Sequence, residues 1–511
     1  MKRLYYIVSL TLALYACQGR LEPVVPVAET ANSSEDIDGF IRETMRTKGD
    51  FRWSMASDQL IWQALRESDG ILSIGYKPAS MSADLRETIH TIDITAANWR
   101  QARQQLFELA FAEERKLNPA LTAADLEAFA ETTLPVMDLR VSSIETIRKL
   151  RQSNAVRYVE PMGYQPGQAS GSRAKTASSS GCGSNIADIP LFEGQDYNTV
   201  SPNTKSPWHH PFHGIRDGWS RSTGAGMNVL LIDTGVSNDQ DNLGSAFNQG
   251  SSSGRRVEKL VTLGKAWPWS SAETPNDGCG HGTSMAGVLT GPRGTDGAAV
   301  GVAYNAGLVS VRAAVDVVLN ESREMKGVAD AYVLAGNRAD VKITSMSLGT
   351  PLYNSQVADA VRYAYNRGKL MFCAGGTSFG WSAGWVGVIF PASMDEVQAV
   401  TGVKDNLNQR CDACHDGSQI DFVVVMEKAS NGRHIPTLAM SGNPPSTVGG
   451  SSAATATTAG MAALVWAQNP GQTREQVVEK LVRASSNYPN RSGNFGWGRI
   501  NVNAALGGVS Q

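Results

Sequence analysis

The sequence predicts an α/β protein with a mostly parallel central sheet that carries helices on both faces, preceded by a smaller α+β domain. After about residue 208, apolar segments of strand length alternate with amphipathic segments of helix length. The 51 glycines exceed the average frequency of about 7%, which favours many tight turns. Strand–helix alternation with glycine-rich turns is typical of parallel sheets, because their crossover helices bury both faces.

The larger domain is expected to contain five buried strands separated by helices. The predicted strands are Asn228–Ile232, Gly307–Val311, Val341–Ser347, Leu370–Ala374 and Glu396–Val403. The predicted helices are Gly282–Thr290, Glu324–Gly336, Asn354–Arg367, Ala453–Gln468 and Thr473–Ala484. In folds of this class, sites form at the carboxyl ends of the strands, so residues that directly follow the strands are the first candidates for chemistry.

The smaller domain is predicted from helical and strand patterns upstream of residue 162. Its predicted helices are Ile37–Thr47, Asp58–Ser68, Ala97–Leu117, Ala123–Thr132 and Ser142–Ser153. Its predicted strands are Gly70–Tyr76, Leu134–Val141 and Ala155–Glu160. The segment Gly163–Gly183 is rich in Gly, Ser, Ala and Gln, a composition typical of an exposed, cleavable linker.

The N-terminus has the layout of a secretory signal. Lys2 and Arg3 precede the apolar stretch Leu4–Ala16, which is shorter than the roughly 20 residues of a membrane-spanning helix. The stretch ends in Leu14-Tyr15-Ala16-Cys17, which resembles a bacterial lipobox, in which the cysteine is lipidated. The alternative is an ordinary signal peptide that contains a cysteine. No second long apolar run follows, so a polytopic membrane protein is excluded.

Composition limits the partners and the cysteine pairing. A formal net charge of −2 gives no electrostatic reason to expect nucleic acid as a partner. Apart from Cys17, the chain has five cysteines, at positions 182, 279, 373, 411 and 414. In an oxidising compartment this odd number allows at most two internal disulfides and leaves one thiol.

Three short motifs supply an acid, a base and a nucleophile in a fixed order. They are VLLIDTGV (229–236), GHGTSMAG (280–287) and GSSAATATTAG (450–460), which contain Asp233, His281 and Ser452. Each residue alone has a commoner structural interpretation, as a turn aspartate, a core histidine or a helix-capping serine. Together, Asp…His…Ser is one of the few orders known to build a catalytic triad.

The motifs, with their separations of about 50 and about 170 residues, resemble those of the subtilisin-like serine proteases over roughly residues 208–506. The resemblance implies that Ser452 attacks the scissile carbonyl, His281 transfers the proton and Asp233 orients the imidazole. It places Ser345–Gly349 in a wall of the substrate cleft. It also implies a cis peptide bond at Phe390-Pro391.

The same resemblance implies a primary substrate pocket without bulky or charged side chains on one wall. The implied substrate-binding residues are Ser347, Leu348, Gly349, Ala374 and Gly375. A broad, apolar preference for polypeptide substrates follows from these residue types.

The upstream segment resembles the inhibitory propeptide of this family, which assists folding and blocks the cleft. The part that carries the resemblance is Pro135–Pro161, which ends in VRYVEP. The expected division is therefore 1–16 lipoprotein signal peptide, 17–69 tether and N-terminal helices, 70–162 propeptide-like α+β domain, 163–207 linker and mature N-terminal region, and 208–511 catalytic domain.

One departure from the family pattern concerns the oxyanion hole. The family carries an Asn after an Ala-Gly pair, whereas this chain has Cys373-Ala374-Gly375-Gly376-Thr377, so Gly376 occupies the Asn position. Loss of that donor costs roughly 10²–10³ in turnover. The Ser452 backbone N–H remains as a donor, and Thr377 or Ser378 offers a hydroxyl. The expected enzyme is a slow protease; the alternative is a pseudoprotease that binds peptides without turnover.

The segment Cys411-Asp412-Ala413-Cys414-His415 matches the C-x-x-C-H pattern of covalent haem attachment. A haem-based electron-transfer protein is disfavoured, because no distal ligand or haem-sized apolar segment accompanies the motif. A local Cys411–Cys414 disulfide is the favoured interpretation, with free thiols or a metal site as alternatives. Two states are left open for Cys279, a disulfide with Cys182 or a buried thiol near His281.

No cofactor is required by the expected chemistry. A structural calcium ion is frequent in the family, and Arg293–Gly297 lies where one calcium loop often falls, but Asp296 is its single carboxylate. The sequence thus predicts an exported serine endopeptidase anchored through Cys17, in the periplasm or at the cell surface of a bacterium and most simply as an outer-membrane lipoprotein. Its own propeptide is the expected inhibitor, and cleavage in the linker would release the catalytic domain.

Overall fold

A computed structural model describes residues 36–166, 181–183, 185–187, 190–377 and 387–509. The predicted signal peptide, Cys17, the tether, most of the predicted linker and Ser378 lie outside these residues. Within the part of the chain that is described, no helix is long and apolar enough to cross a membrane. The described residues from Asp36 onward belong to one compact unit.

Seven parallel strands form the central sheet of the larger domain, in the order β13-β12-β11-β10-β7-β9-β8. The strands are β7 (Asn228–Asp233), β8 (Val257–Val261), β9 (Gly307–Arg312), β10 (Val341–Met346), β11 (Leu370–Ala374), β12 (Gln398–Lys404) and β13 (Ile420–Glu427). The predicted fold class is therefore confirmed. The two strands that sequence patterns missed, β8 and β13, are the edges of the sheet.

The strand order reverses beside β7. The chain runs from β7 to β8 and β9 on one side, and then crosses to β10 on the other side. Such a reversal opens a crevice at the carboxyl end of the sheet, because the connections leave in opposite directions. Asp233 is the last residue of β7, so the fold places this carboxylate at the crevice.

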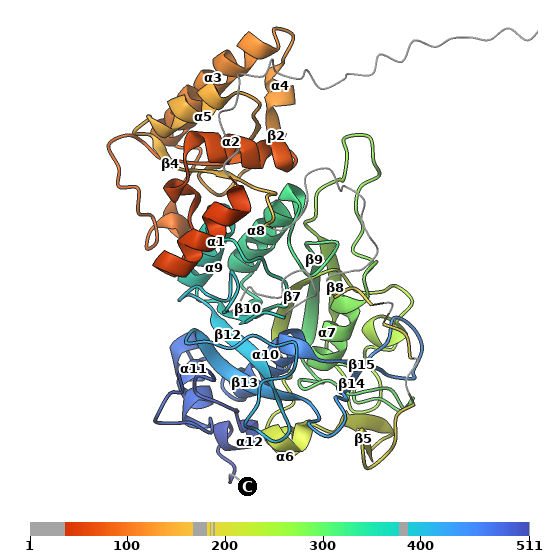
Figure 1. Ribbon diagram of the computed structural model, residues 1–511. Helices are drawn as coiled ribbons and strands as arrows, with labels where there is room; N and C mark the ends of the chain where they lie inside the picture. Colours follow the sequence, from red (N-terminus) through yellow and green to blue (C-terminus); the bar gives the residue numbers. More distant parts are fainter. Residues whose placement is uncertain (1–35, 167–180, 184, 188–189, 378–386, 510–511) are drawn as a thin grey trace, which may run out of the picture. The chain divides into compact units, whose positions relative to one another are not determined.

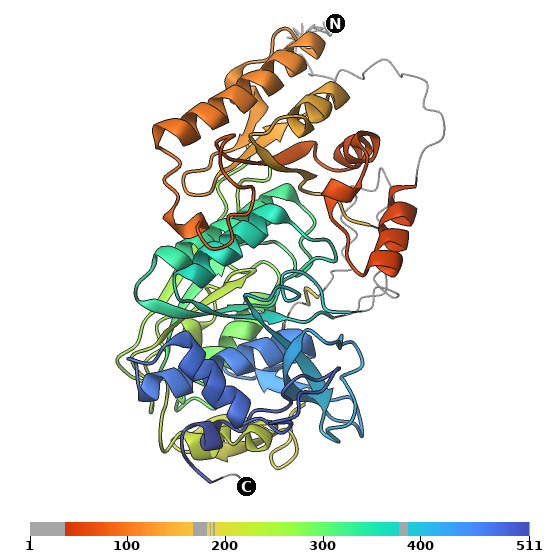
Figure 2. The same cartoon turned by 90° about the vertical axis from the view of Figure 1, so that its left-hand side faces the viewer.

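Helices cover both faces of the sheet (Figures 1 and 2). On one face α7 (His281–Thr290) packs against α10 (Gly450–Gln468), and on the other face α8 (Ser322–Asn337) packs against α9 (Ser355–Asn366). The α10 helix consists mainly of Ala, Thr and Gly, and nearly all its residues are buried. Its small side chains allow close approach: a Cβ at Gly460 would lie only 2.7 Å from Val302 Cβ.

The remaining elements of the larger domain are short. Two hairpins are formed by β5 (Tyr197–Val200) with β6 (Thr204–Pro207) and by β14 (Ile435–Thr437) with β15 (Ser446–Val448). The other helices are α6 (Ile215–Gly218), α11 (Arg474–Arg483), α12 (Val502–Ala505) and the 3₁₀ turns η3 (His210–His213) and η4 (Asp241–Leu243).

The smaller domain is an α+β unit with an antiparallel sheet in the order β2-β3-β1-β4. Its strands are β1 (Ile71–Tyr76), β2 (Glu127–Phe129), β3 (Val136–Arg140) and β4 (Val156–Pro161). Its helices are α1 (Ile37–Lys48), α2 (Asp58–Glu67), α3 (Ala97–Leu117), α4 (Ala123–Leu126), α5 (Ile144–Arg151) and the turns η1 (Trp53–Met55) and η2 (Ile89–Thr91). From β1 to β4 this is the ferredoxin-like βαββαβ order.

The predicted helix Ala123–Thr132 is wrong in its second half. The helix α4 ends at Leu126, and Glu127–Phe129 form the edge strand β2. Glu and Ala favour helices, but β2 pairs with Leu139 and Asp138 of β3. This tertiary pairing outweighs the small difference in intrinsic propensity.

The smaller domain lies against α8 and α9 (Figure 1). Two of its carboxyl groups accept hydrogen bonds at the beginnings of these helices. Asp69 accepts hydrogen bonds from the backbone N–H and the hydroxyl of Ser322, the first residue of α8. Glu160 accepts the same pair of bonds from Ser355, the first residue of α9. These bonds satisfy backbone N–H groups that the first turn of a helix leaves unpaired.

A buried ion pair reinforces the contact between the domains. The Arg157 guanidinium donates two hydrogen bonds to the Asp359 carboxylate, at 2.8 and 2.9 Å. The two side chains are only 7% and 3% exposed. Such a bidentate pair fixes the relative orientation of its two planar groups, and here it joins β4 to α9.

Three histidines are buried together in and beside η3. Burial lowers the pKa of His210 and of His213 to about 3 and that of His209 well below its ordinary value. Among the described residues, neither ring nitrogen of His209 has a hydrogen-bond partner. All three rings are therefore neutral in the folded protein at neutral pH.

We expect this cluster to make the fold acid-sensitive. As the pH falls below the ordinary value of about 6.5, the unfolded chain binds protons that the folded chain excludes, so the stability falls between pH 6.5 and about 3. The loss at pH 4.5 should be roughly 3 kcal/mol for each of His210 and His213. The variant His209→Phe, which removes no hydrogen bond, should match wild type at pH 7 and lose less stability at pH 4.5 in urea unfolding. Parallel losses in both proteins would contradict the assignment.

Candidate active site

Asp233 and His281 meet at the carboxyl end of β7. The His281 Nδ1–H donates a hydrogen bond to Asp233 Oδ1 at 2.7 Å, and the two side chains are 7% and 0% exposed. The same carboxylate oxygen accepts from the backbone N–H of Thr234 at 2.8 Å. These contacts hold the imidazole with Nδ1 protonated, so that Nε2 is the nitrogen that gains or loses a proton.

Glycines allow the histidine to approach the strand. His281 is the first residue of α7, one position before the predicted start, and follows Gly280, whose φ is +91°. A Cβ at Gly282 would lie 3.0 Å from Gly235 N and 3.2 Å from Asp233 Oδ1. A larger residue at this position would therefore push α7 away from β7.

Asp277 is a positioning residue that sequence reasoning missed. Its carboxylate accepts hydrogen bonds from the backbone N–H groups of Cys279 and Gly280, both at 2.8 Å, and from the N–H and hydroxyl of Thr283 at 2.9 and 2.7 Å. It also accepts from Thr234 Oγ1 at 3.0 Å. Asp277 thus caps α7 and ties it to the residue after Asp233. The signal in the sequence was an aspartate six residues before a threonine, which matches no standard capping spacing.

The electrostatics of the pair favour a charged imidazole. Burial acts to lower the pKa of His281, but the charge and hydrogen bond of Asp233, with smaller contributions from Asp277 and Asp316, raise it above its ordinary value. A base of this kind takes up a proton readily when one is released beside it.

Ser452 lines a cavity together with most of the predicted substrate-binding residues. It lies in the first turn of α10, which begins at Gly450, whereas the sequence predicts a helix that begins at Ala453. Its side chain makes no hydrogen bond to another described residue, and its carbonyl accepts from Ser347 Oγ at 3.0 Å. The cavity is lined by Val317, Val318, Ser347, Leu348, Gly349, Thr350, Pro351, Ala374, Gly376, Thr377, Ile389, His415, Ser451 and Ser452.

Gly375 lies outside the cavity, whereas Thr377 lines it and bonds to a neighbouring serine. The Gly375 N–H donates to Val400 O at 2.8 Å, and a Cβ there would meet the Ile420 side chain. The Thr377 hydroxyl is hydrogen-bonded to the Ser451 hydroxyl at 2.9 Å. The Phe390-Pro391 peptide is cis, as the resemblance implied.

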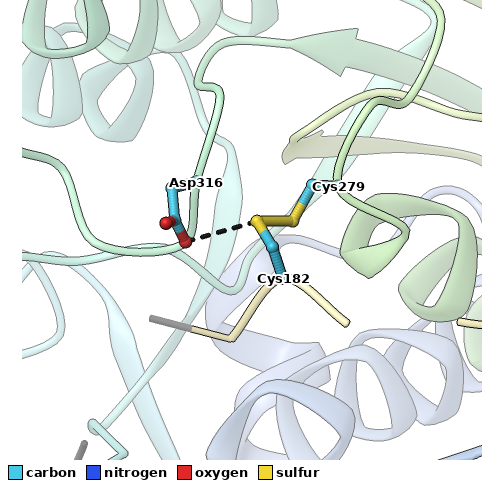
Figure 3. A group of neighbouring side chains, drawn as sticks. All are labelled: Cys182, Cys279 and Asp316. Atoms are coloured by element: carbon cyan, nitrogen blue, oxygen red, sulfur yellow. Dashed lines mark hydrogen bonds between the residues drawn. A yellow bond between two sulfur atoms is a disulfide. The ribbon is translucent and has the colours of Figure 1, made fainter. Parts of the chain in front are cut away.

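Four of the five described cysteines form disulfides. Cys411 is bonded to Cys414, as favoured, and Cys182 is bonded to Cys279, which decides between the two states left open. Cys373 is a buried free thiol. In Figure 3, Asp316 Oδ1 lies 3.4 Å from Cys182 Sγ; the bonded sulfur carries no proton, so this is a contact between a carboxylate and a disulfide. The Cys182–Cys279 disulfide attaches the end of the predicted linker to the turn before His281.

The described residues offer little to a metal ion. Among the described His, Cys, Asp and Glu residues, only Cys182, Cys279 and Asp316 form a group of three close enough to share a metal ion. Two of these are joined as a disulfide, whereas a metal requires a thiolate. In the predicted calcium loop, Asp296 Oδ2 accepts from the side-chain amides of Asn242 and Gln249. Those N–H donors stand where further oxygen ligands would be needed. The residues present do not fit calcium at this position, and calcium elsewhere stays an untested expectation.

A parallel α/β sheet with an aspartate at a strand end, a histidine at one helix start and a serine at another defines the class of Asp–His–Ser hydrolase folds. Within this class, the chain belongs to peptidase family S8, the subtilase family, whose model matches residues 224–498.

Several curated proteins share this similarity. Alkaline elastase YaB from Bacillus sp. (strain YaB) is 31% identical over 283 residues, which cover 55% of this chain and 65% of that protein. Subtilisin Savinase from Lederbergia lenta is 28% identical over 286 residues, which cover 55% of this chain and 91% of that protein. The chain thus spans less than two thirds of the length of the elastase. A crystal structure of MycP1 from Mycobacterium smegmatis is 21% identical with a TM-score of 0.46, over 61% of this chain and 88% of that chain.

The hydrogen bond between Asp233 and His281 predicts a measurable change in the titration of His281 when the carboxylate is removed. In Asp233→Asn the burial of the ring remains while the carboxylate charge is lost, so the pKa of His281 should fall from above to below its ordinary value of 6.5. Imidazole NMR titration of the full chain measures this. The control Asp93→Asn, which changes an exposed carboxylate of the smaller domain, should leave the titration unchanged. An unshifted titration in Asp233→Asn would show that the pair does not set the histidine's charge.

Proposed function

We propose that this chain is a serine endopeptidase that hydrolyses peptide bonds with Asp233, His281 and Ser452. The observation that carries the proposal is the buried 2.7 Å hydrogen bond between His281 and Asp233, at the same edge of the sheet as the cavity that contains Ser452. The side chain of Ser452 is not hydrogen-bonded to the imidazole. Such contacts are often loose without substrate and tighten in the reacting complex.

The reaction has two halves. Ser452 Oγ attacks the scissile carbonyl while His281 Nε2 accepts its proton, and Asp233 stabilises the imidazolium through Nδ1–H. The imidazolium then gives this proton to the leaving amine, which leaves an acyl group on Ser452. Water, deprotonated by the same imidazole, attacks the acyl carbonyl and regenerates the serine. The first turn of α10 supplies the Ser452 backbone N–H to the oxyanion.

The substrates are proposed to be polypeptides with an apolar side chain at the bond to be cleaved. The cavity beside Ser452 has Val317, Val318, Leu348 and Ile389 in its lining. No lysine, arginine, aspartate or glutamate is among its described lining residues. A charged side chain placed there would lose its hydration without gaining a partner.

The smaller domain is proposed to be an intramolecular inhibitor and folding aid. Buried contacts hold the smaller domain against α8 and α9, so that the segment after β4 extends to the cavity. Four residues after β4, the Gln165 side chain donates a hydrogen bond to Thr350 Oγ1 at 3.0 Å, and Thr350 lines the cavity. A segment held at this wall competes with substrate until the following linker is cut.

Export and anchoring through a lipid on Cys17 complete the proposal. They rest on the basic residues Lys2 and Arg3, the short apolar stretch and the Leu-Tyr-Ala-Cys sequence. The two disulfides of the larger domain agree with an oxidising compartment. Because the lipid would lie before the linker, cleavage there would free the catalytic domain unless the smaller domain stays bound.

The catalytic role of Ser452 is tested by labelling the full chain with a fluorophosphonate, which reacts with activated serines. We expect one adduct, on Ser452, because the neighbouring imidazole raises the nucleophilicity of the hydroxyl. Ser452→Ala should give no adduct, and Asp233→Asn should label about 10⁴-fold more slowly. Peptide turnover should fall in parallel. A folded wild-type chain that shows no adduct after its smaller domain is removed by limited proteolysis would favour a peptide-binding pseudoprotease.

Anchoring is tested by fractionation of the producing bacterium. We expect the full-length chain in the membrane fraction and a smaller, soluble species that begins within residues 163–183. In Cys17→Ser both species should be soluble, because a single residue carries the lipid. Equal membrane association of wild type and Cys17→Ser would contradict lipidation. A Ser452→Ala chain that is still cut in the linker would contradict self-processing.

A further inference from the structure

The position of the missing oxyanion asparagine is filled by another polar side chain. Gly376 has a φ of +128°, a conformation that is essentially restricted to glycine. A Cβ added to Gly376 would lie 3.0 Å from His415 Cγ and 3.1 Å from Cε1, and closer still to Nδ1. The imidazole of His415 therefore occupies the space into which a side chain at position 376 would extend.

The backbone around His415 is held firmly against this strand end. The His415 N–H donates to Gly376 O at 3.0 Å. The preceding residue, Cys414, forms an isolated antiparallel β-bridge with Thr377. Thr401 Oγ1 donates to the carbonyl of His415. The Cys411–Cys414 disulfide closes the turn directly before the histidine. The C-x-x-C-H sequence thus serves to fix one imidazole beside Gly376.

The ring carries an N–H donor and is almost fully buried. His415 is 6% exposed and lines the same cavity as Ser452. Its Nδ1–H donates to the carbonyl of Gly387 at 2.9 Å. Burial lowers the pKa of the imidazole, so the ring is neutral at neutral pH and its donor is an uncharged N–H.

We propose that His415 is a catalytic residue that replaces the family asparagine as the side-chain donor of the oxyanion hole. This inference rests on the proposed peptidase function. As Ser452 attacks, the substrate carbonyl oxygen gains negative charge and accepts hydrogen bonds from the Ser452 backbone N–H and from His415 Nδ1–H. The second bond is transferred from the Gly387 carbonyl; no proton changes its heavy atom. Preorganised donors of this kind lower the barrier most in a water-excluded site, and a neutral imidazole can act as such an electrophile.

The position of the His415 imidazole also explains why Gly376 departs from the family pattern. An asparagine at 376 and the imidazole at 415 would occupy the same space, so the chain can carry one donor or the other. The missing asparagine then does not imply a slow enzyme.

The test compares the wild-type full chain with two variants at position 415. His415→Phe keeps an aromatic ring without an N–H donor, and His415→Gln restores an amide donor. We expect His415→Phe to lower kcat for a peptide substrate by 10²–10³-fold with KM changed less than about threefold, the signature of a bond made only in the transition state. The rate of fluorophosphonate labelling of Ser452 should fall in parallel, because its phosphoryl oxygen uses the same donors. His415→Gln should recover at least about tenfold of the loss.

The matched control is His434→Phe. The side chain of His434 is 44% exposed and does not line the cavity. The kcat of this variant should stay within about twofold of wild type. Thermal unfolding of each variant separates loss of a donor from loss of the fold. A folded His415→Phe with wild-type kcat and labelling rate would overturn the inference and leave the peptidase function intact. Loss in His415→Phe that appears in KM or melting temperature and is not recovered in His415→Gln would reduce His415 to a structural residue. Absence of labelling and turnover in wild type would overturn the proposed function and this inference together.

Discussion

One buried hydrogen bond, from His281 Nδ1 to Asp233 Oδ1, constrains where the neighbouring strand ends and the neighbouring helix begins. A strand must end at Asp233 and a helix must begin at His281, close enough that a Cβ at Gly282 would lie 3.0 Å from Gly235 N and 3.2 Å from Asp233 Oδ1. Asp277 meets this requirement by capping α7 and binding the residue after Asp233. The charges of these carboxylates outweigh the burial of the ring and raise the pKa of His281. The pair is thus held in position before any substrate arrives.

A second histidine, His415, is also held close to a strand end, here the end of β11. There β11 ends at Ala374 and a turn through Gly375 and Gly376 leaves room for an imidazole that comes from a distant loop. His415 is positioned by the Cys411–Cys414 disulfide and by a backbone hydrogen bond to Gly376, whereas His281 is positioned by the Asp277 cap of α7. In both cases glycine removes bulk from the sheet edge so that a histidine can approach it. The two histidines have opposite electrostatics, since carboxylates raise the pKa of His281 and burial lowers that of His415.

The smaller domain uses the free ends of α8 and α9 rather than the cleft for most of its buried polar contacts. Asp69 and Glu160 bind where those helices begin, and Arg157 pairs with Asp359 one turn further along α9. These helices lie on the face of the sheet opposite α7 and α10, which carry His281 and Ser452. A domain attached there can extend its C-terminal segment to Thr350 without disturbing the Asp233–His281 pair. This separation agrees with the proposed role of the smaller domain as an inhibitor that also assists folding.

By itself, the sequence determined the α/β class, most strand and helix positions and the residues Asp233, His281 and Ser452, because hydrophobic periodicity and short motifs are local properties. It erred where a contact between distant segments decided the outcome: Glu127–Phe129 became a strand by pairing with β3, and α10 began three residues early, at Gly450. Only the tertiary structure decided the pairing of Cys182 with Cys279, the capping role of Asp277 and the meeting of His415 with Gly376. His415 and Gly376 are 39 positions apart in the sequence, and only the alignment of parallel strand ends brings such segments together at one edge.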